Sequence, residues 1–233
     1  MVDLVIFLIL ALAVLAGYYR GFVYSAISIG TTVLSFFLAL LCIPLPTGVI
    51  KGSETLYPML IYYFEGHEYI NETSVELKHE RVIDISEEQI DIVIENADMP
   101  IPFGRAAKAN VMNREYEQLG IYTLGDYFNQ TVVDVVINIL SLLLLFIIFR
   151  LVLGFALHLI DHSVGGLPVL QRFDAPISLG IGFLHGTILV FILFMLVPIV
   201  LSILPELYEY IEDSVFGRFF YRVNVFLRMI PNN

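Results

Sequence analysis

The chain of 233 residues is 58% hydrophobic and carries a formal net charge of −11, so it lacks the basic surface expected of a nucleic-acid-binding protein. Its single cysteine, Cys42, excludes an internal disulfide and a cysteine-based metal cluster. The apolar residues gather into long runs, which favours a membrane protein over a soluble domain.

Four runs are long enough, or nearly long enough, to cross a bilayer as helices, which takes about 20 residues. They are Leu4–Ala16, Phe22–Ile43, Val132–Phe149 and Ile177–Leu204. The first is short, although Tyr18 and Tyr19 extend it with rings suited to the membrane interface. No positively charged segment precedes this run, so we expect a retained helix; a cleaved signal peptide, suggested by its small alanines, is the alternative.

The first two runs are separated only by the turn Gly17–Gly21, so residues 1–43 are expected to form a transmembrane hairpin of antiparallel helices. Arg20 lies in this turn, and Arg150 and Arg172 flank the turn between the last two runs. Because arginines near span ends tend to remain in the cytoplasm, both turns are expected there, with the N-terminus outside. Three arginines near the C-terminus favour the opposite orientation: Arg218, Arg222 and Arg228.

Residues 44–131 form an acidic insert of 88 residues, which holds 15 of the 23 acidic residues but only 6 of the 12 basic ones. The orientation above places this insert outside the cytoplasm. Ser86 and Gln89 have the spacing of a capping box, which predicts a helix with one apolar face. A second helix is expected over Gly104–Leu119, ended by Gly120. We therefore expect a mostly helical extracytoplasmic insert.

Thr123–Asp126 has the pattern of a further helix cap, while Val75–Ile85 has weak strand character. Residues 132–205 are expected to form the second transmembrane hairpin. Residues 206–233 then combine an acidic patch with apolar side chains at helical spacing, which predicts an amphipathic C-terminal helix. Its apolar face would contain Phe216, Phe219, Phe220, Val223, Leu227 and Ile230. Such a face either lies in the membrane interface or packs against the other helices.

Two patterns in the apolar runs carry a family resemblance. Asp3 precedes the first run, which closes on Gly17–Phe22, and the loop Gly166–Asp174 leads to Leu179–Gly186 in the last run. In these patterns the chain resembles the colicin V production protein family, whose members are bacterial inner-membrane proteins with four spans. The resemblance implies a role in producing or exporting a secreted peptide toxin and in envelope maintenance, without an established biochemical activity.

The resemblance covers roughly residues 1–43 and 132–204, and the chain departs from it in two places. Family members commonly carry an arginine directly after the loop aspartate, whereas here Ala175 follows Asp174. The 88-residue insert also replaces a connection that is usually much shorter. Any function tied to the aspartate–arginine pair therefore does not transfer directly.

The turn and the loop supply the first candidate residues. Arg20, next to Gly21, could pair with Asp174 across the cytoplasmic face, or contact an anionic lipid or ligand. The simpler interpretation is an arginine that keeps its charge among the headgroups and sets the topology.

Small residues in the last span supply the second candidates. Gly182 and Gly186 form a GxxxG pattern, extended by Ser178, and Gly180 lies in the same run. Small residues allow close approach of helix backbones in a membrane. Possible partner notches are Ala13 with Gly17 on the first span and Ala26 with Gly30 on the second. Packing within one chain is expected over dimerisation.

Asp134, Asn138 and Ser141 form a polar stripe on one face of the third span. Ionisable residues inside a membrane usually face a bundle interior or water. The stripe is therefore either a hydrophilic path from outside, or an interfacial Asp134 together with an Asn138 that hydrogen-bonds a neighbouring helix.

His158 and His162 share a helix face, as in a H-x-x-E-H metalloprotease motif with aspartate in place of glutamate. A catalytic zinc site needs a third ligand and a general base, and the sequence offers no convincing pair. We expect no catalytic residue, cofactor or metal, with the metal-dependent hydrolase kept as a remote alternative.

These observations predict an all-α membrane protein with four transmembrane helices in two hairpins, a helical insert and an amphipathic C-terminal helix. We expect a non-enzymatic component of the bacterial inner membrane that supports toxin or bacteriocin production or export and cell-envelope homeostasis. The alternative is an oligomeric small-solute transporter or channel subunit. The expected partners are the lipid bilayer and an unidentified membrane or envelope protein, while homo-oligomer formation stays open.

Overall fold

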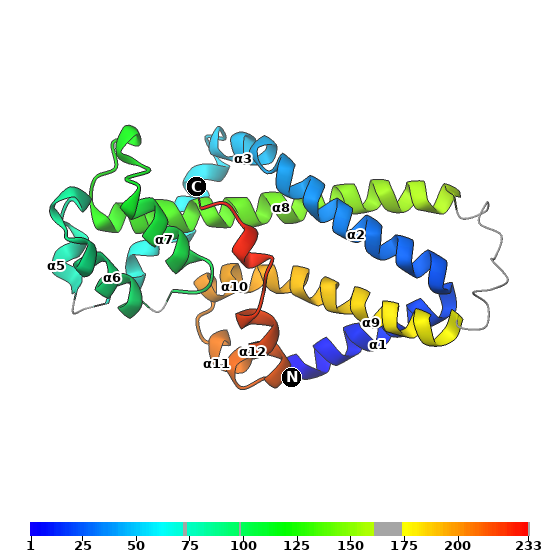
Figure 1. Cartoon of the computed structure of the whole chain (residues 1–233). Coiled ribbons are helices and arrows are strands. Elements are labelled where there is room, and N and C mark those ends of the chain that lie inside the picture. Colours follow the sequence, from blue (N-terminus) through cyan, green and yellow to red (C-terminus); the bar gives the residue numbers. More distant parts are fainter. Residues whose placement is uncertain (72–73, 98, 161–173, 233) are drawn as a thin grey trace. The chain divides into compact units, whose positions relative to one another are not determined.

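The structure is a computed structural model that describes residues 1–71, 74–97, 99–160 and 174–232 (Figure 1). The described residues form helices and turns without a strand; Arg81 and Thr123 make an isolated β-bridge. Four described helices are long and apolar enough to cross a membrane: Val2–Arg20, Phe22–Cys42, Leu124–His158 and Ala175–Ile203. The predicted all-helical class with four apolar helices is therefore confirmed.

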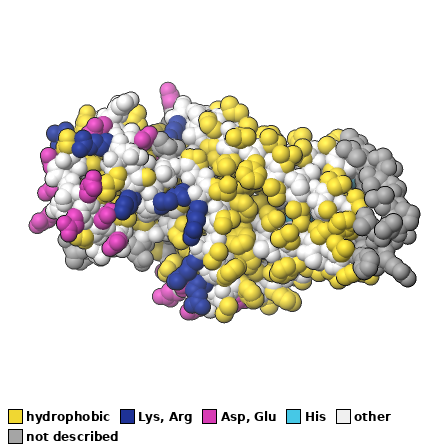
Figure 2. Space-filling model, in the orientation of Figure 1, with side chains coloured by type: hydrophobic (Ala, Val, Ile, Leu, Met, Phe, Trp, Pro, Cys, Tyr) yellow, Lys and Arg dark blue, Asp and Glu magenta, His cyan; other side chains and the backbone are white. Residues whose placement is uncertain are grey.

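The chain divides into two compact units, and each is built from three separate stretches. The first unit, which we call the span unit, contains Met1–Ile43, Leu142–Met195 and Tyr208–Asn224. The second, which we call the insert unit, contains Pro44–Ser141, Leu196–Leu207 and Val225–Asn233. Hydrophobic side chains cover the long helices, whereas acidic side chains gather over the insert (Figure 2).

The span unit is organised around the packing of α1 (Val2–Arg20) against α9 (Asp174–Leu193), which run side by side in Figure 1. Gly21 separates α1 from α2 (Phe22–Cys42) with a φ of 79°, a conformation that favours glycine because it has no Cβ. The sequence predicts α1 and α2 as antiparallel neighbours, but the principal packing partner of α1 is α9.

The insert unit contains α3 (Pro44–Lys51), α4 (Leu56–Tyr63), α5 (Val75–Lys78), α6 (Glu87–Asn96), α7 (Phe103–Met112) and α10 (Val197–Ile203). Its apolar core joins α6 and α7 to the first half of α8 (Leu124–Ile160). Its aromatic side chains include Tyr127 and Phe128, which are completely buried. The insert therefore has an interior of its own.

Local capping explains several boundaries in the insert unit. Ser86 Oγ accepts a hydrogen bond from the Gln89 backbone N–H, and the Ser86 backbone N–H donates to Gln89 Oε1, so the predicted capping box is confirmed. Thr123 Oγ1 likewise accepts from the Asp126 N–H at the start of α8. Both caps satisfy backbone donors that the first turn of a helix leaves unpaired.

Two expectations for the insert are wrong in detail. The helix expected over Gly104–Leu119 ends at Met112, because Arg114 adopts a φ of 51° that breaks the helical path. A short 3₁₀ turn follows and ends, as predicted, at Gly120 with a φ of 77°. The segment Val75–Ile85 forms α5 and a 3₁₀ turn rather than a strand.

The prediction of a single amphipathic helix over residues 206–233 is also wrong. The chain instead forms α11 (Leu207–Glu212), α12 (Val215–Arg222) and a 3₁₀ turn, η7 (Leu227–Met229). Ser214 starts α12 by accepting a hydrogen bond from the Gly217 N–H, which interrupts the helical repeat. The expected apolar face is split, since Phe220 is buried against Phe191 of α9 while Phe219 is half exposed.

Helix α8 has 37 residues and a length of about 55 Å, which exceeds a bilayer core of about 30 Å. Its residues from Val132 to Ile139 are almost completely buried by protein. Farther along, it presents large apolar side chains outward, including Leu151 and Phe155. The part of α8 suited to contact lipid therefore lies C-terminal to the start of the expected span at Val132.

Candidate functional site

The glycines of α9 form a close contact with α1. A Cβ added at Gly182 would lie 2.7 Å from the Ala13 carbonyl oxygen, and one at Gly186 would lie 2.7 Å from the Ala13 Cβ. Gly17 faces the same seam, since its Cβ would lie 2.7 Å from the Ser178 carbonyl oxygen. These positions tolerate only a hydrogen, because real Cβ atoms do not approach other atoms so closely.

Gly180 and Gly30 behave differently. A Cβ at either position would meet no other atom within 4 Å. The structure thus places Gly182 and Gly186 against the notch of Ala13 and Gly17, and gives no such contact to Gly180 or to Gly30 of α2.

A cavity of about 160 Å³, which we call the Arg20 cavity, lies beside this seam within the span unit. Its lining includes Arg20, Tyr24, Ser28 and His185. The Arg20 guanidinium lies 5.2 Å from the centroid of the Tyr24 ring, in cation–π geometry. The cavity is therefore a mixed polar and aromatic space next to the α1–α2 turn.

Polar side chains continue from this cavity along α2. The Thr32 hydroxyl donates to the Ser28 carbonyl oxygen and lies 2.9 Å from His185 Nε2. Because that hydroxyl has one hydrogen, His185 Nε2 is the donor in the second contact. Arg150 of α8 donates to Ser28 Oγ at 3.0 Å and to Thr31 Oγ1 at 3.3 Å. Sequence reasoning missed this cluster, although serines and threonines recur at helical spacing along α2.

Several predicted residues cannot be placed in a site. Asp174 begins α9, but its side chain lies outside the described residues, so its pairing with Arg20 stays a prediction. His162 and Arg172 also lie outside the described residues. The hydrolase interpretation depends on His162, so the structure does not test it. In the described part of the chain, no three His, Cys, Asp or Glu side chains come together as a metal site.

The polar stripe of α8 is buried in the insert unit. Asp134 Oδ1 lies 2.9 Å from Lys51 Nζ and accepts a hydrogen bond of 2.9 Å from Gln130 Nε2. The Thr47 hydroxyl lies 3.3 Å from Asn138 Oδ1 and 3.2 Å from Ser141 Oγ. Each member of the stripe thus has a partner on α3 or α8. The contact of Asn138 with Thr47 of α3 is the kind expected if Asn138 hydrogen-bonds a neighbouring helix, whereas Asp134 is buried rather than interfacial; the hydrophilic path stays a prediction.

The C-terminal segment is held by side chains of the same unit. Asn138 Nδ2 donates to the Pro231 carbonyl oxygen at 3.2 Å, and Asn110 Nδ2 donates to that of Asn232 at 2.8 Å. Arg105 donates to the carbonyl oxygens of Arg228 and Ile230. These side chains therefore hold the main chain of the C-terminal segment against α7 and α8.

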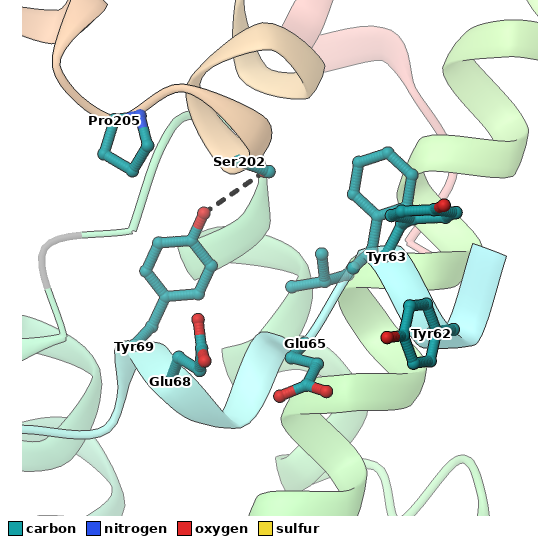
Figure 3. Close-up of a pocket in the computed structure, with 9 residues that line it drawn as sticks. Tyr62, Tyr63, Glu65, Glu68, Tyr69, Ser202 and Pro205 are labelled. Carbon is teal, nitrogen blue, oxygen red and sulfur yellow. Dashed lines mark hydrogen bonds between the residues drawn. The ribbon is translucent and has the colours of Figure 1, made fainter. Parts of the chain in front are cut away.

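A cavity in the insert unit has a volume of about 490 Å³, and we call it the Tyr–Glu cavity (Figure 3). Its lining residues are Tyr62, Tyr63, Phe64, Glu65, Glu68, Tyr69, Val132, Ser202 and Pro205. The rings of Tyr62 and Tyr63 at the end of α4 meet edge to face, with centroids 5.2 Å apart. The cavity therefore combines aromatic rings with two carboxylates.

A short 3₁₀ turn, η1 (Gly66–Tyr69), positions one wall of the Tyr–Glu cavity. Gly66 allows η1 to approach α8, because a Cβ there would lie 2.2 Å from the Phe128 carbonyl oxygen. The Tyr69 hydroxyl donates to Ser202 Oγ at 3.2 Å (Figure 3). Burial raises the pKa of Tyr69, which keeps this donor protonated.

Sequence reasoning missed the Tyr–Glu cavity. The available signal was the cluster of aromatic and acidic residues from Tyr62 to Tyr69, directly after an apolar helix. Paired tyrosines at the end of such a helix are typical of a membrane interface. The contributions of Ser202 and Pro205 could not be read locally, because they lie more than 130 residues away along the chain.

Comparison with known protein families adds one finding. Residues 2–65 match the family of the colicin V production protein. No curated protein and no solved structure matches the chain. The predicted resemblance over residues 1–43 is thus confirmed, and the match extends beyond it to residue 65, within the insert. Its second part, over residues 132–204, stays a prediction.

The matched region contains Arg20, Gly21 and the first part of the Tyr–Glu cavity up to Glu65. Asp134 and Gly182 lie outside it. With its four apolar helices, the chain is a multi-pass membrane protein that resembles the colicin V production protein family over its first 65 residues.

Proposed function

We propose that this chain is a non-enzymatic component of the bacterial inner membrane that supports the production or export of a peptide toxin and cell-envelope homeostasis. The observation that carries the proposal is the match of residues 2–65 to the colicin V production protein family. Four helices capable of crossing a membrane are consistent with this role.

The proposed mechanism is binding of a lipid or of another membrane or envelope protein. The stripe of Asp134, Asn138 and Ser141 supports binding over transport, because its polar groups have partners within the insert unit. A solute path needs polar groups that can exchange partners with the passing solute. Arg20 and the acidic insert are the proposed contact surfaces.

Complementation tests this function directly. A colicin V-producing strain that lacks its own member of the family would express this chain, and the zone of killing on a sensitive lawn would be measured. Restored killing, reduced by Arg20→Ala but not by Gly180→Ala at equal membrane levels, is expected. Absence of restoration by correctly inserted wild-type protein would overturn the toxin role, while detergent sensitivity of the strain separately tests the envelope role.

One observation favours the second candidate, an oligomeric transporter or channel subunit. The Arg20 cavity and the polar cluster of Ser28, Thr31, Thr32 and His185 place hydrogen-bonding groups inside the span unit. Solute and ion flux into liposomes containing the protein tests this candidate. Flux that changes in Thr32→Val but not in Gly180→Ala would favour transport over binding.

A further inference from the structure

The Tyr–Glu cavity supports an inference that goes beyond the proposed function and does not depend on it. We propose that this cavity binds an organic ammonium group, supplied by a zwitterionic lipid headgroup or by a small free amine. The juxtaposition of aromatic rings, carboxylates and a hydroxyl in one space carries the proposal (Figure 3).

The charge of the cavity is the first step. Glu65 and Glu68 are exposed carboxylates in its wall, and no lysine or arginine lines it. The nearest cationic group to Glu65 in the described structure is His67, whose Nε2 lies 3.8 Å from Oε2 and is charged only when protonated. Within the described residues Glu68 makes no ion pair. The cavity therefore offers negative charge to a cationic ligand.

The aromatic rings determine which cation fits. Tyr62 and Tyr63 are more than half exposed, so their rings are available to a ligand. A cation over a ring face is attracted by the negative potential of that face, and quaternary ammonium groups are recognised in this way. Phe64 and Val132 add apolar surface, which suits methyl or methylene groups better than a hydrated metal ion.

Size and position are consistent with such a ligand. A volume of about 490 Å³ falls within the range of about 300–1,000 Å³ typical of small-molecule sites. Ser202 lies at the end of the candidate span Ala175–Ile203, and Pro205 follows it. Span ends lie at the depth of lipid headgroups, where tyrosines are enriched. A lipid headgroup and a free amine would both reach a cavity at this level.

Two binding measurements on the full chain in dodecyl maltoside separate the two sources. Calorimetric titration with choline chloride, against sodium chloride at the same ionic strength, tests for a free ammonium group. Native mass spectrometry with phosphatidylethanolamine, against phosphatidylglycerol, tests for a lipid headgroup. Saturable choline binding assigns the site to a free amine, and selective retention of phosphatidylethanolamine without choline binding assigns it to a lipid.

Matched variants link the binding to the cavity. The double variant Glu65→Gln/Glu68→Gln should weaken binding about tenfold or more, whereas Glu76→Gln, an exposed acid of α5 outside the cavity, should leave it unchanged. Tyr62→Leu should weaken binding at least about threefold and Tyr62→Phe should preserve it, because only the first removes the ring. Tyr62 is 73% exposed, so neither change should disturb folding.

Three results would overturn the proposal. They are the absence of both choline and phosphatidylethanolamine binding by folded protein, equal retention of phosphatidylglycerol and phosphatidylethanolamine without choline binding, and binding that the double glutamine variant leaves intact. Failure of toxin complementation would leave this result unaffected, since the binding measurements need no toxin.

Discussion

At the scale of single residues, the buried ion pair of the insert unit is asymmetric. The side chain of Asp134 is 2% exposed, whereas that of Lys51 is 35% exposed. The lysine can therefore recover hydration when its partner is lost, but the carboxylate cannot. This difference allows the contribution of the two charges to be separated.

Lys51→Met should lower the free energy of unfolding by about 3 kcal/mol, because it leaves the buried Asp134 carboxylate without its cationic partner, although Gln130 still donates to it. Asp134→Asn should cost less, and the double variant should be close to Asp134→Asn alone. Denaturant unfolding in detergent, followed by circular dichroism, measures all three. An Asp134→Asn protein that is less stable than Lys51→Met would contradict this account.

The glycines of α9 allow an internal comparison on one helix. Gly182→Ala should destabilise the protein by about 1–3 kcal/mol, because its Cβ would overlap the Ala13 carbonyl group. Gly180→Ala gives the same gain in helix propensity without an overlap, so it should be neutral or stabilising. Thermal unfolding in detergent distinguishes them, and equal melting temperatures would show that the α1–α9 contact does not require glycine.

At the scale of elements, α8 is the helix whose surroundings change most along its length. Up to Ser141 it belongs to the insert unit, and from Leu142 it belongs to the span unit. Its hydrophobic sequence does not reveal this change, since buried protein and lipid both select apolar side chains. The location of its lipid-facing part is therefore a structural result with a chemical test.

In a Cys42→Ser background, a cysteine at Leu151 should react with a lipid-soluble maleimide in membranes, because this side chain is 69% exposed. A cysteine at Val136, which is completely buried, should react only after denaturation. The labelling yield at each position, measured as a mass shift of the protein, tests which part of α8 faces the lipid. Rapid labelling of Val136→Cys in native membranes would place the lipid boundary nearer the start of α8.

The elements that the sequence predicts well are those determined by neighbouring residues. Two such features are the capping box at Ser86 and Gln89 and the end of a helical turn at Gly120. Both depend on residues a few positions apart, so the sequence alone predicts them. The contact of Gly182 with Ala13 was among the expected possibilities, since small residues on two apolar helices suggest a seam.

The remaining features depend on residues distant in sequence. Lys51 and Asp134 are separated by 83 positions, and Tyr69 and Ser202 by 133, so no local pattern pairs them. The C-terminal segment was misjudged for a related reason. Its helical spacing is real, but Ser214 offers a competing cap that hydrogen-bonds Asp3 at the other end of the chain.

At the scale of the whole molecule, the proposed orientation makes opposite predictions for two exposed positions. In intact cells carrying Cys42→Ser, a membrane-impermeant maleimide should label Glu88→Cys of the insert, which the orientation places outside. It should label Tyr19→Cys, beside the first turn, only after the membrane is permeabilised. Both side chains are exposed in the protein, so burial does not limit the reaction. The reverse pattern would invert the topology.

The construction of each unit from three separated stretches has a consequence for synthesis on the ribosome. Until the segment beginning at Val225 has emerged, Asn110 and Asn138 have not met the main-chain carbonyl groups of Asn232 and Pro231. The insert of the nascent chain therefore lacks these hydrogen bonds while the two later apolar helices, α8 and α9, are inserted into the membrane. This incompletely folded intermediate would be exposed to membrane quality-control proteases. Translation pausing or a premature stop codon shortly before Val225 is therefore expected to reduce protein abundance strongly, although few residues would be missing.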